Sequence, residues 1–159
     1  MAQPRHVIIA GAGIAGLTAA LALARAGIRV TVYEQTGKLE ETGAGVQLSP
    51  NGSRVLIALG LRERLASVAV APKAIRVMSG GSAREVVRIP LGEEVEQRFG
   101  APYWSIHRGD LQSALVDAVR NERDIALELG VRIEDFAAHG RGVSVLGKRG
   151  SQVLDERGI

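Results

Sequence analysis

The sequence predicts an α/β fold built around a parallel βαβ unit, and three observations support this prediction. The short apolar run Val7–Ala10 is followed at once by the pattern G-x-G-x-x-G, formed by Gly11, Gly13 and Gly16, which opens a helical pattern. A second strand pattern then ends at Glu34. The chain is 46% hydrophobic but has only five aromatic residues, so its core must consist of Val, Ile, Leu and Ala. Together these features are typical of a Rossmann-like sheet.

The three glycines have separate roles in the predicted unit. Gly11 permits a sharp turn, Gly13 lets the backbone approach a pyrophosphate, and Gly16 lets the helix pack closely on the strand. The helix N-terminus offers unpaired N–H groups and the positive end of its dipole to phosphates. The candidate cofactor-binding residues in this stretch are therefore Gly11, Ala12, Gly13, Ile14, Ala15 and Gly16.

Glu34 is the expected ribose ligand. It lies 18 positions after Gly16, at the end of the second strand, where a carboxylate can accept both hydroxyls of an adenosine ribose. A glutamate there disfavours a 2′-phosphate. The sequence therefore predicts FAD or NAD at this site rather than NADP.

This region has two other interpretations. The eighteen residues Val7–Ala24 carry no charge, which is the lower limit for a membrane span, and their flanks mimic a secretory signal. Half of this run is Gly and Ala, however, and neither membrane interpretation explains the following strand with its acidic residue. A chance match to the glycine pattern is the other alternative, and the surrounding strand, helix and Glu34 argue against it.

The remaining elements follow from periodicity, caps and turn residues. The first helix is predicted over Ile14–Ala26 and the second strand over Arg29–Glu34, with Ser49 and Pro50 opening a further helix. The later elements are a helical turn at Leu61–Ser67, two antiparallel strands at Ile75–Met78 and Glu85–Ile89, a helix at Asp110–Glu122, a third parallel strand at Ile125–Leu129, and a small meander at Val131–Phe136, Val143–Leu146 and Gln152–Leu154.

Composition excludes several classes of function. There is no cysteine, so disulfides, thiolate catalysis and cysteine-ligated metals do not arise. The three histidines lack metal-ligand spacing, and no metal is predicted. The net charge is +3, but the basic residues are scattered and no aromatic platform alternates with them, so neither nucleic acid nor membrane is an expected partner. A cytoplasmic location is expected by default.

Three stretches together resemble a known family. They are Gly11–Glu34, then Glu41–Asn51 followed by Leu59-Gly60-Leu61, and finally Ile106–Leu111. In this order and spacing they resemble the N-terminal part of the group A FAD-dependent aromatic monooxygenases, most closely the salicylate hydroxylase and hydroxynicotinate monooxygenase branch. The resemblance covers almost the whole chain.

The resemblance implies further contacts with FAD. In such enzymes the loop that matches Gly43–Gln47 passes close to the flavin, which makes Gly45 and Val46 candidate cofactor contacts. The arginine that matches Arg108 reaches the FAD pyrophosphate or ribitol. Gln112, one helical turn after Arg108, could add a hydrogen bond to the ribitol, but a solvated helix face is the favoured interpretation. Taken alone, the stretch could instead be an ordinary loop, and Arg108 could be a solvated arginine at the start of a helix.

The implied reaction is hydroxylation of a small phenolic or aromatic-acid substrate, with NADH or NADPH as a transient co-substrate. Because the flavin carries the oxygen-transfer chemistry, no catalytic residue is assigned. Two alternatives remain at this stage. One is an NAD-dependent dehydrogenase or another two-dinucleotide oxidoreductase, and the other is a non-catalytic truncated remnant.

Domain boundaries and completeness are further expectations. Residues 1–70 and 105–159 are expected to form an incomplete FAD-binding domain, with 71–104 a β-rich insertion that belongs to a substrate domain. The family's later Asp-Gly segment and its ribitol-contacting Gly-Asp-Ala segment have no counterpart here. The chain is therefore expected to be truncated, inactive alone, and prone to self-association through an exposed sheet edge or through exchange of the Gln152–Ile159 tail.

Overall fold

The computed structural model describes residues 5–39, 43–140, 142–150 and 152–158, and contacts between Cα atoms divide the chain into two compact units. The first unit comprises Met1–Glu41 and Gln112–Ile159, and the second comprises Thr42–Leu111. Each unit is described by itself. The predicted domain boundaries, 1–70 with 105–159 around 71–104, differ from these units and stay a prediction.

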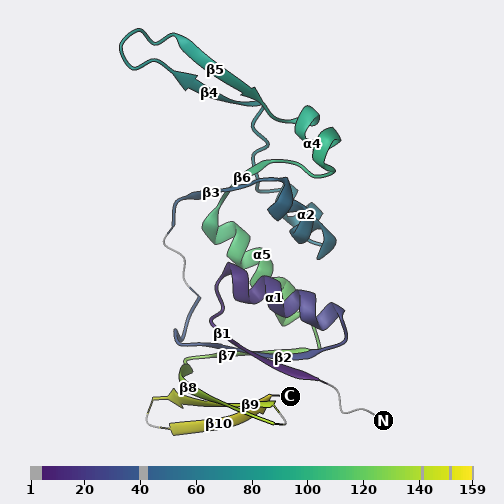
Figure 1. Ribbon diagram of the computed structural model, residues 1–159, viewed down its shortest axis with the longest axis vertical. Helices are drawn as coiled ribbons and strands as arrows, with labels where there is room; N and C mark the ends of the chain where they lie inside the picture. Colours follow the sequence, from purple (N-terminus) through teal and green to yellow (C-terminus); the bar gives the residue numbers. More distant parts are fainter. Residues whose placement is uncertain (1–4, 40–42, 141, 151, 159) are drawn as a thin grey trace. The chain divides into compact units, whose positions relative to one another are not determined.

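A three-stranded parallel sheet forms the centre of the first unit (Figure 1). Its strands are β1 (His6–Ala10), β2 (Arg29–Glu34) and β7 (Ile125–Leu129), with β2 between the other two. The register places Thr31 of β2 beside Ile8 on one side and beside Ala126 on the other. Both the predicted βαβ unit and the predicted third parallel strand are thereby confirmed.

Helix α1 (Ile14–Arg25) covers one face of this sheet. Its buried residues are Leu17, Ala20, Leu21 and Ala24. The uncharged run Val7–Ala24 is thus divided between β1, a glycine turn and α1. Among the residues that the structure describes, no helix has the length and apolar character needed to cross a membrane.

An antiparallel meander lies on the other side of the sheet from α1. It consists of β8 (Arg132–His139), β9 (Gly142–Arg149) and β10 (Gln152–Gly158), which are longer than predicted; Ile159 of the predicted tail lies outside the described residues. The end of β10 lies against β1, since a Cβ added to Gly158 would come within 3.2 Å of the His6 carbonyl oxygen. Thr31 of β2 also shares hydrogen bonds with His6 and with Glu156 of β10.

The second unit contains both the helix predicted after Ser49 and the helical turn predicted at Leu61–Ser67. Helix α2 (Pro50–Ala58) has Ser49 as its N-cap residue and Pro50 in its first turn, and α3 (Arg62–Ala66) follows. The Ser49 hydroxyl bonds to the Asn51 side chain and makes no capping bond to the backbone. Ser53 on α2 is fully buried and donates to the Pro102 carbonyl oxygen at 2.6 Å.

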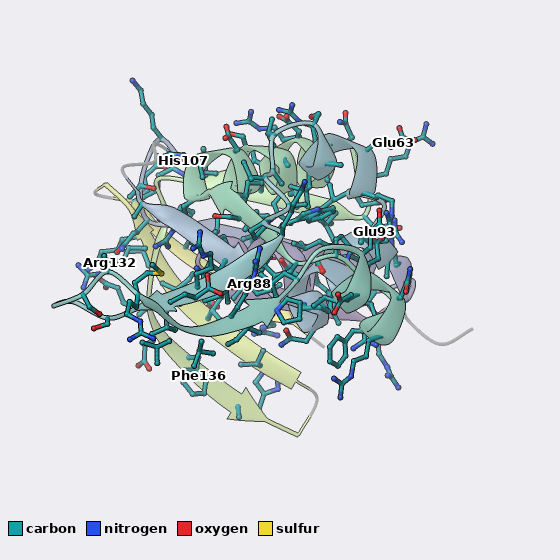
Figure 2. The ribbon with its side chains drawn as sticks, turned by 90° about the horizontal axis from the view of Figure 1, so that it is seen from above. Glu63, Arg88, Glu93, His107, Arg132 and Phe136 are labelled. Atoms are coloured by element: carbon teal, nitrogen blue, oxygen red, sulfur yellow. The ribbon has the colours of Figure 1, made fainter. Side chains whose placement is uncertain are left out.

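Two small antiparallel sheets complete this unit. Strand β3 (Gly45–Leu48) pairs with β6 (Trp104–His107), and β4 (Ala74–Met78) pairs with β5 (Glu85–Pro90). In the β4–β5 ribbon every residue of β5 is exposed, and Figure 2 shows Arg88 projecting from it. The apolar residues Ile75, Val77, Val87 and Ile89 pair across this ribbon, and each is more than a third exposed.

Two helices depart from the sequence prediction. Helix α5 (Arg108–Arg120) begins and ends two residues earlier than predicted. Helix α4 (Glu93–Phe99) was not predicted, because its seven residues include no buried one and therefore show no apolar periodicity. Left-handed glycines bound α4, with φ of 68° at Gly92 and 73° at Gly100.

We expect Gly16→Ala to lower the free energy of unfolding by at least about 1–3 kcal/mol. The cost of overpacking is larger than the stability gained from the higher helix propensity of alanine. An ideal Cβ at Gly16 would lie 2.0 Å from the carbonyl oxygen of Gly11, a backbone atom that cannot rotate away. Gly13→Ala is the matched control, because a Cβ there has no heavy atom within 4 Å. Urea midpoints compare the two variants, and equal stability would contradict the packing role of Gly16.

Candidate functional site

The glycine turn joins β1 to α1 and leaves the helix N-terminus open. Gly11 has a φ of 105°, which favours glycine, and its N–H continues the sheet by donating to the Tyr33 carbonyl oxygen at 2.7 Å. Gly13 is the N-cap residue of α1, with no side-chain capping bond and no acidic residue in the first turn. The first N–H groups of α1 therefore lack intrahelical acceptors and lie at the positive end of its dipole.

The residues of the turn differ in how far they are exposed to solvent. Gly13 and Ala15 are exposed, and a Cβ on Gly13 would enter open space. Ala12, which directly precedes Gly13, is fully buried. The turn thus presents backbone rather than side chains to solvent, as the expected approach of a pyrophosphate requires.

Glu34 holds this turn through its carboxylate. Its Oε2 accepts the Ala12 N–H at 2.8 Å, and its Oε1 accepts the Thr36 N–H at 2.9 Å and the Thr36 hydroxyl at 3.0 Å. Partial burial raises the pKa of Glu34, but hydrogen bonds from Thr36, Ala12 and Gln35 together outweigh it and leave the pKa below its ordinary value. Glu34 is therefore an ionised acceptor at neutral pH.

A cavity of about 330 Å³ opens beside this carboxylate. The Val131 N–H donates to the Glu34 carbonyl oxygen at 2.9 Å, which brings the start of β8 to the end of β2. The lining residues are Ala10, Gly11, Tyr33, Glu34, Gln35, Val131, Arg132 and Ile133. Sequence reasoning missed residues 131–133 because β8 reaches the site only through tertiary folding. Gln35 had a usable signal, since it directly follows the predicted ribose ligand.

Gln112 on α5 belongs to the turn rather than to a solvated helix face. Its side chain is partly buried, and its Nε2 donates to the Ala12 carbonyl oxygen at 3.2 Å. The backbone of Ala12 is therefore held at both ends, by Glu34 at its N–H and by Gln112 at its carbonyl. The sequence interpretation of Gln112 as solvated was wrong, because it considered α5 without a partner.

The second unit holds the other predicted cofactor contacts. Gly45 and Val46 lie on β3, opposite His107 and Ile106 of β6, so part of the expected loop is a strand. A Cβ on Gly43 would lie 3.2 Å from the Cβ of Arg108, and both residues are exposed. Glu41 and Thr42, the first residues of this motif, lie outside the described residues. The contact of Gly45, Val46 and Arg108 with a cofactor stays a prediction.

Comparison with known proteins agrees with this geometry. A protein family described as FAD binding domain matches residues 5–152. The 3-amino-4-hydroxybenzoate 2-monooxygenase of Streptomyces cremeus is 42% identical, and 3-hydroxybenzoate 6-hydroxylase 1 of Aquipseudomonas alcaligenes is 38% identical; each match covers 82% of this chain and 33% of the relative. The structure of Klebsiella pneumoniae HpxO with FAD and uric acid superposes with a TM-score of 0.80 and 26% identity, over 97% of this chain and 37% of that chain.

The fold and the open glycine turn define a dinucleotide-binding α/β protein. The family match is more specific, and the chain belongs to the FAD binding domain family found in flavin-dependent aromatic monooxygenases. It spans about a third of the length of these relatives. Both the predicted family resemblance and the FAD cofactor are confirmed.

Acid should weaken the contribution of Glu34 to stability. Because the pKa of Glu34 is lowered by folding, its stabilising effect is complete above about pH 4.3, the pKa of an unperturbed glutamate, and is lost as the pH falls through the lowered folded value. Glu34→Gln should therefore unfold more easily than the parent near neutral pH, and this difference should shrink in acid. Urea unfolding across this range measures it, with Glu63→Gln on α3 as an exposed control. A difference that stays constant with pH would contradict the prediction.

Proposed function

We propose that this chain is the FAD-binding part of an NADH- or NADPH-dependent monooxygenase that hydroxylates a small phenolic or aromatic-acid substrate. The observation that carries the proposal is the pairing, within one compact unit, of an open helix N-terminus with an ionised Glu34 on the adjacent strand. The relatives that match the chain are named as monooxygenases of hydroxybenzoates, which favours this function over a dehydrogenase.

The described residues fit FAD. The pyrophosphate oxygens would accept hydrogen bonds from the backbone N–H groups of Gly13 to Ala15 at the start of α1. The open space at Gly13 permits this close approach. The adenosine would take the cavity beside Glu34, with the ribose hydroxyls donating to the carboxylate. Gly11 and Gly16 would shape the turn. The hydrogen bonds of the Ala12 backbone to Glu34 and Gln112 would keep the turn in a fixed orientation.

Residues of the second unit would contact the rest of the cofactor. Arg108 is permanently charged and exposed at the start of α5, and its planar guanidinium suits a phosphate or a ribitol oxygen. Gly45 and Val46 would present strand backbone to the flavin. When bound, FAD supplies the redox chemistry, so the roles proposed for this chain are binding and orientation.

Other assignments complete the proposal. The region 71–104, with its exposed β4–β5 ribbon, belongs to a substrate domain, while residues 1–70 and 105–159 form the FAD-binding domain. The protein acts in the cytoplasm, and its partners are FAD and a small aromatic molecule.

We expect Glu34→Ala and Gly13→Val each to weaken FAD binding. Loss of a charge-assisted hydrogen bond at Glu34 should cost about 1.5–3 kcal/mol, or roughly 10- to 150-fold in affinity. Gly13→Val places a side chain where the pyrophosphate would lie, and it should still fold because that space is open without ligand. Quenching of flavin fluorescence measures the affinity, and Glu63→Ala is the control. Parent-like affinity in both site variants would show that FAD binds elsewhere.

The 159-residue protein alone should not hydroxylate an aromatic substrate. The chain spans a third of the length of its relatives, and the residues proposed to face the flavin, including Gly45 and Arg108, are exposed to water. A flavin reduced in such a setting should be reoxidised by dioxygen to give hydrogen peroxide instead of hydroxylated product. Chromatography after incubation with FAD, NADH or NADPH and 3-hydroxybenzoate tests this. Hydroxylated product formed in step with NAD(P)H oxidation would overturn it.

The purified chain should also associate with itself. In the part of the chain that the structure describes, β1 pairs with β2 alone, and Val7, Ile8 and Ile9 are only half-buried. An apolar edge of this kind is a template for strand pairing. Sedimentation at micromolar concentration should show dimers or larger species, whereas a monomer with a cooperative melt would contradict this expectation.

A further inference from the structure

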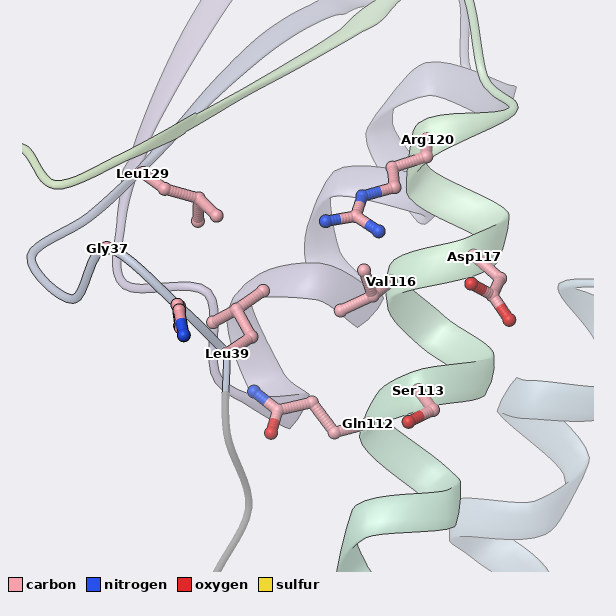
Figure 3. Close-up of a pocket in the computed structure, with 9 residues that line it drawn as sticks. Gly37, Leu39, Gln112, Ser113, Val116, Asp117, Arg120 and Leu129 are labelled. Atoms are coloured by element: carbon pink, nitrogen blue, oxygen red, sulfur yellow. The ribbon is translucent and has the colours of Figure 1, made fainter.

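A second pocket lies beside the glycine turn within the first unit (Figure 3). It has a volume of about 370 Å³, within the range of small-molecule sites, and lies between α5, the loop at 37–39 and the end of β7. Leu39, Val116 and Leu129 provide apolar lining, while Gln112, Asp117 and Arg120 provide polar lining. The site already described uses only Gln112 of these.

Arg120 is the informative residue in this pocket. In the part of the chain that the structure describes, it has no ion pair and no side-chain hydrogen bond. Its position in the last turn of α5 favours a cation through the helix dipole, but that effect does not require the guanidinium to extend toward the loop, as Figure 3 shows it does. Lys38 of the loop also lines the pocket and adds a second positive charge. Figure 3 shows the Asp117 carboxylate directed away from the Arg120 guanidinium.

The lining chemistry suits a ligand that combines a phosphate with a flat organic group. The guanidinium and the ammonium match phosphate oxygens, and the three aliphatic side chains match the face of a ring. The FAD pyrophosphate and adenosine are already assigned to the glycine turn and to the cavity beside Glu34. A reaction that reduces FAD requires a second dinucleotide, which must bind elsewhere.

We propose that this pocket binds the phosphate-bearing part of the nicotinamide dinucleotide that reduces the flavin, with Arg120 as its main phosphate contact. The inference rests on the proposed function, because that function requires the co-substrate. It makes Arg120 a binding residue for the co-substrate alone and assigns it no role toward FAD.

ADP-ribose is a suitable probe, because it carries the pyrophosphate and adenosine without a nicotinamide that could react. Calorimetric titrations use the full chain with Gly13→Val, which blocks the glycine turn. Adding Arg120→Gln should weaken ADP-ribose binding about tenfold. Arg123→Gln is the matched control, since it removes the same charge from an exposed residue outside the pocket. Asp117→Asn should leave the affinity unchanged or increase it.

Several results would overturn the proposal. They are the absence of ADP-ribose binding when the glycine turn is blocked, equal losses in the Arg120 and Arg123 variants, and a loss of FAD affinity caused by Arg120→Gln alone. The last result would assign the pocket to the FAD pyrophosphate. Failure of the proposed function is distinguishable, because it would appear as parent-like FAD binding in the Glu34→Ala and Gly13→Val variants. Circular dichroism confirms that each variant is folded.

Discussion

The buried peptide backbone of Ala12 is the constraint on which the rest of the site depends. Its N–H donates to Glu34 on β2 and its carbonyl accepts from Gln112 on α5, so one residue of the glycine turn links the sheet to two helices. A bond from a backbone N–H to a carboxylate is charge-assisted and stronger than a neutral one. The turn is therefore held in shape before any ligand arrives, which lowers the ordering cost of binding.

This arrangement separates two requirements that a dinucleotide site must meet. Rigidity comes from the buried side of the turn, where Gly16 admits the Gly11 carbonyl oxygen and Ala12 is fixed at both ends. Access comes from the exposed side, where Gly13 and Ala15 leave the backbone uncovered. A side chain added on the first side disturbs folding, whereas one added at Gly13 disturbs only a bound phosphate.

Local signals allowed the sequence to predict the parallel unit and a site for FAD or NAD, and the family resemblance then specified FAD. The turn at Gly11, the helix after Gly13 and the strand ending at Glu34 are each determined by residues within a few positions. Residues that reach the site through tertiary folding gave no such signal, and Val131 and Gln112 were missed or misinterpreted for this reason. Helix α4 was missed because it buries nothing, and β3 was read as a loop because Gly45 weakens a strand pattern.

The hydrogen bonds at Glu34 also limit what its carboxylate can still accept. A carboxylate has about four lone-pair positions. Oε1 receives two donors from Thr36, Oε2 receives one from Ala12, and the Gln35 backbone adds a weaker bond to the carboxylate. A vicinal diol would thus find at most one vacant acceptor position, on Oε2. Its second hydroxyl would have to compete with the Thr36 side chain, which can rotate away, rather than with a backbone group, which cannot. The expectation that Glu34 receives both ribose hydroxyls therefore holds only if Thr36 changes its rotamer, and this threonine would then take part in the recognition of the sugar.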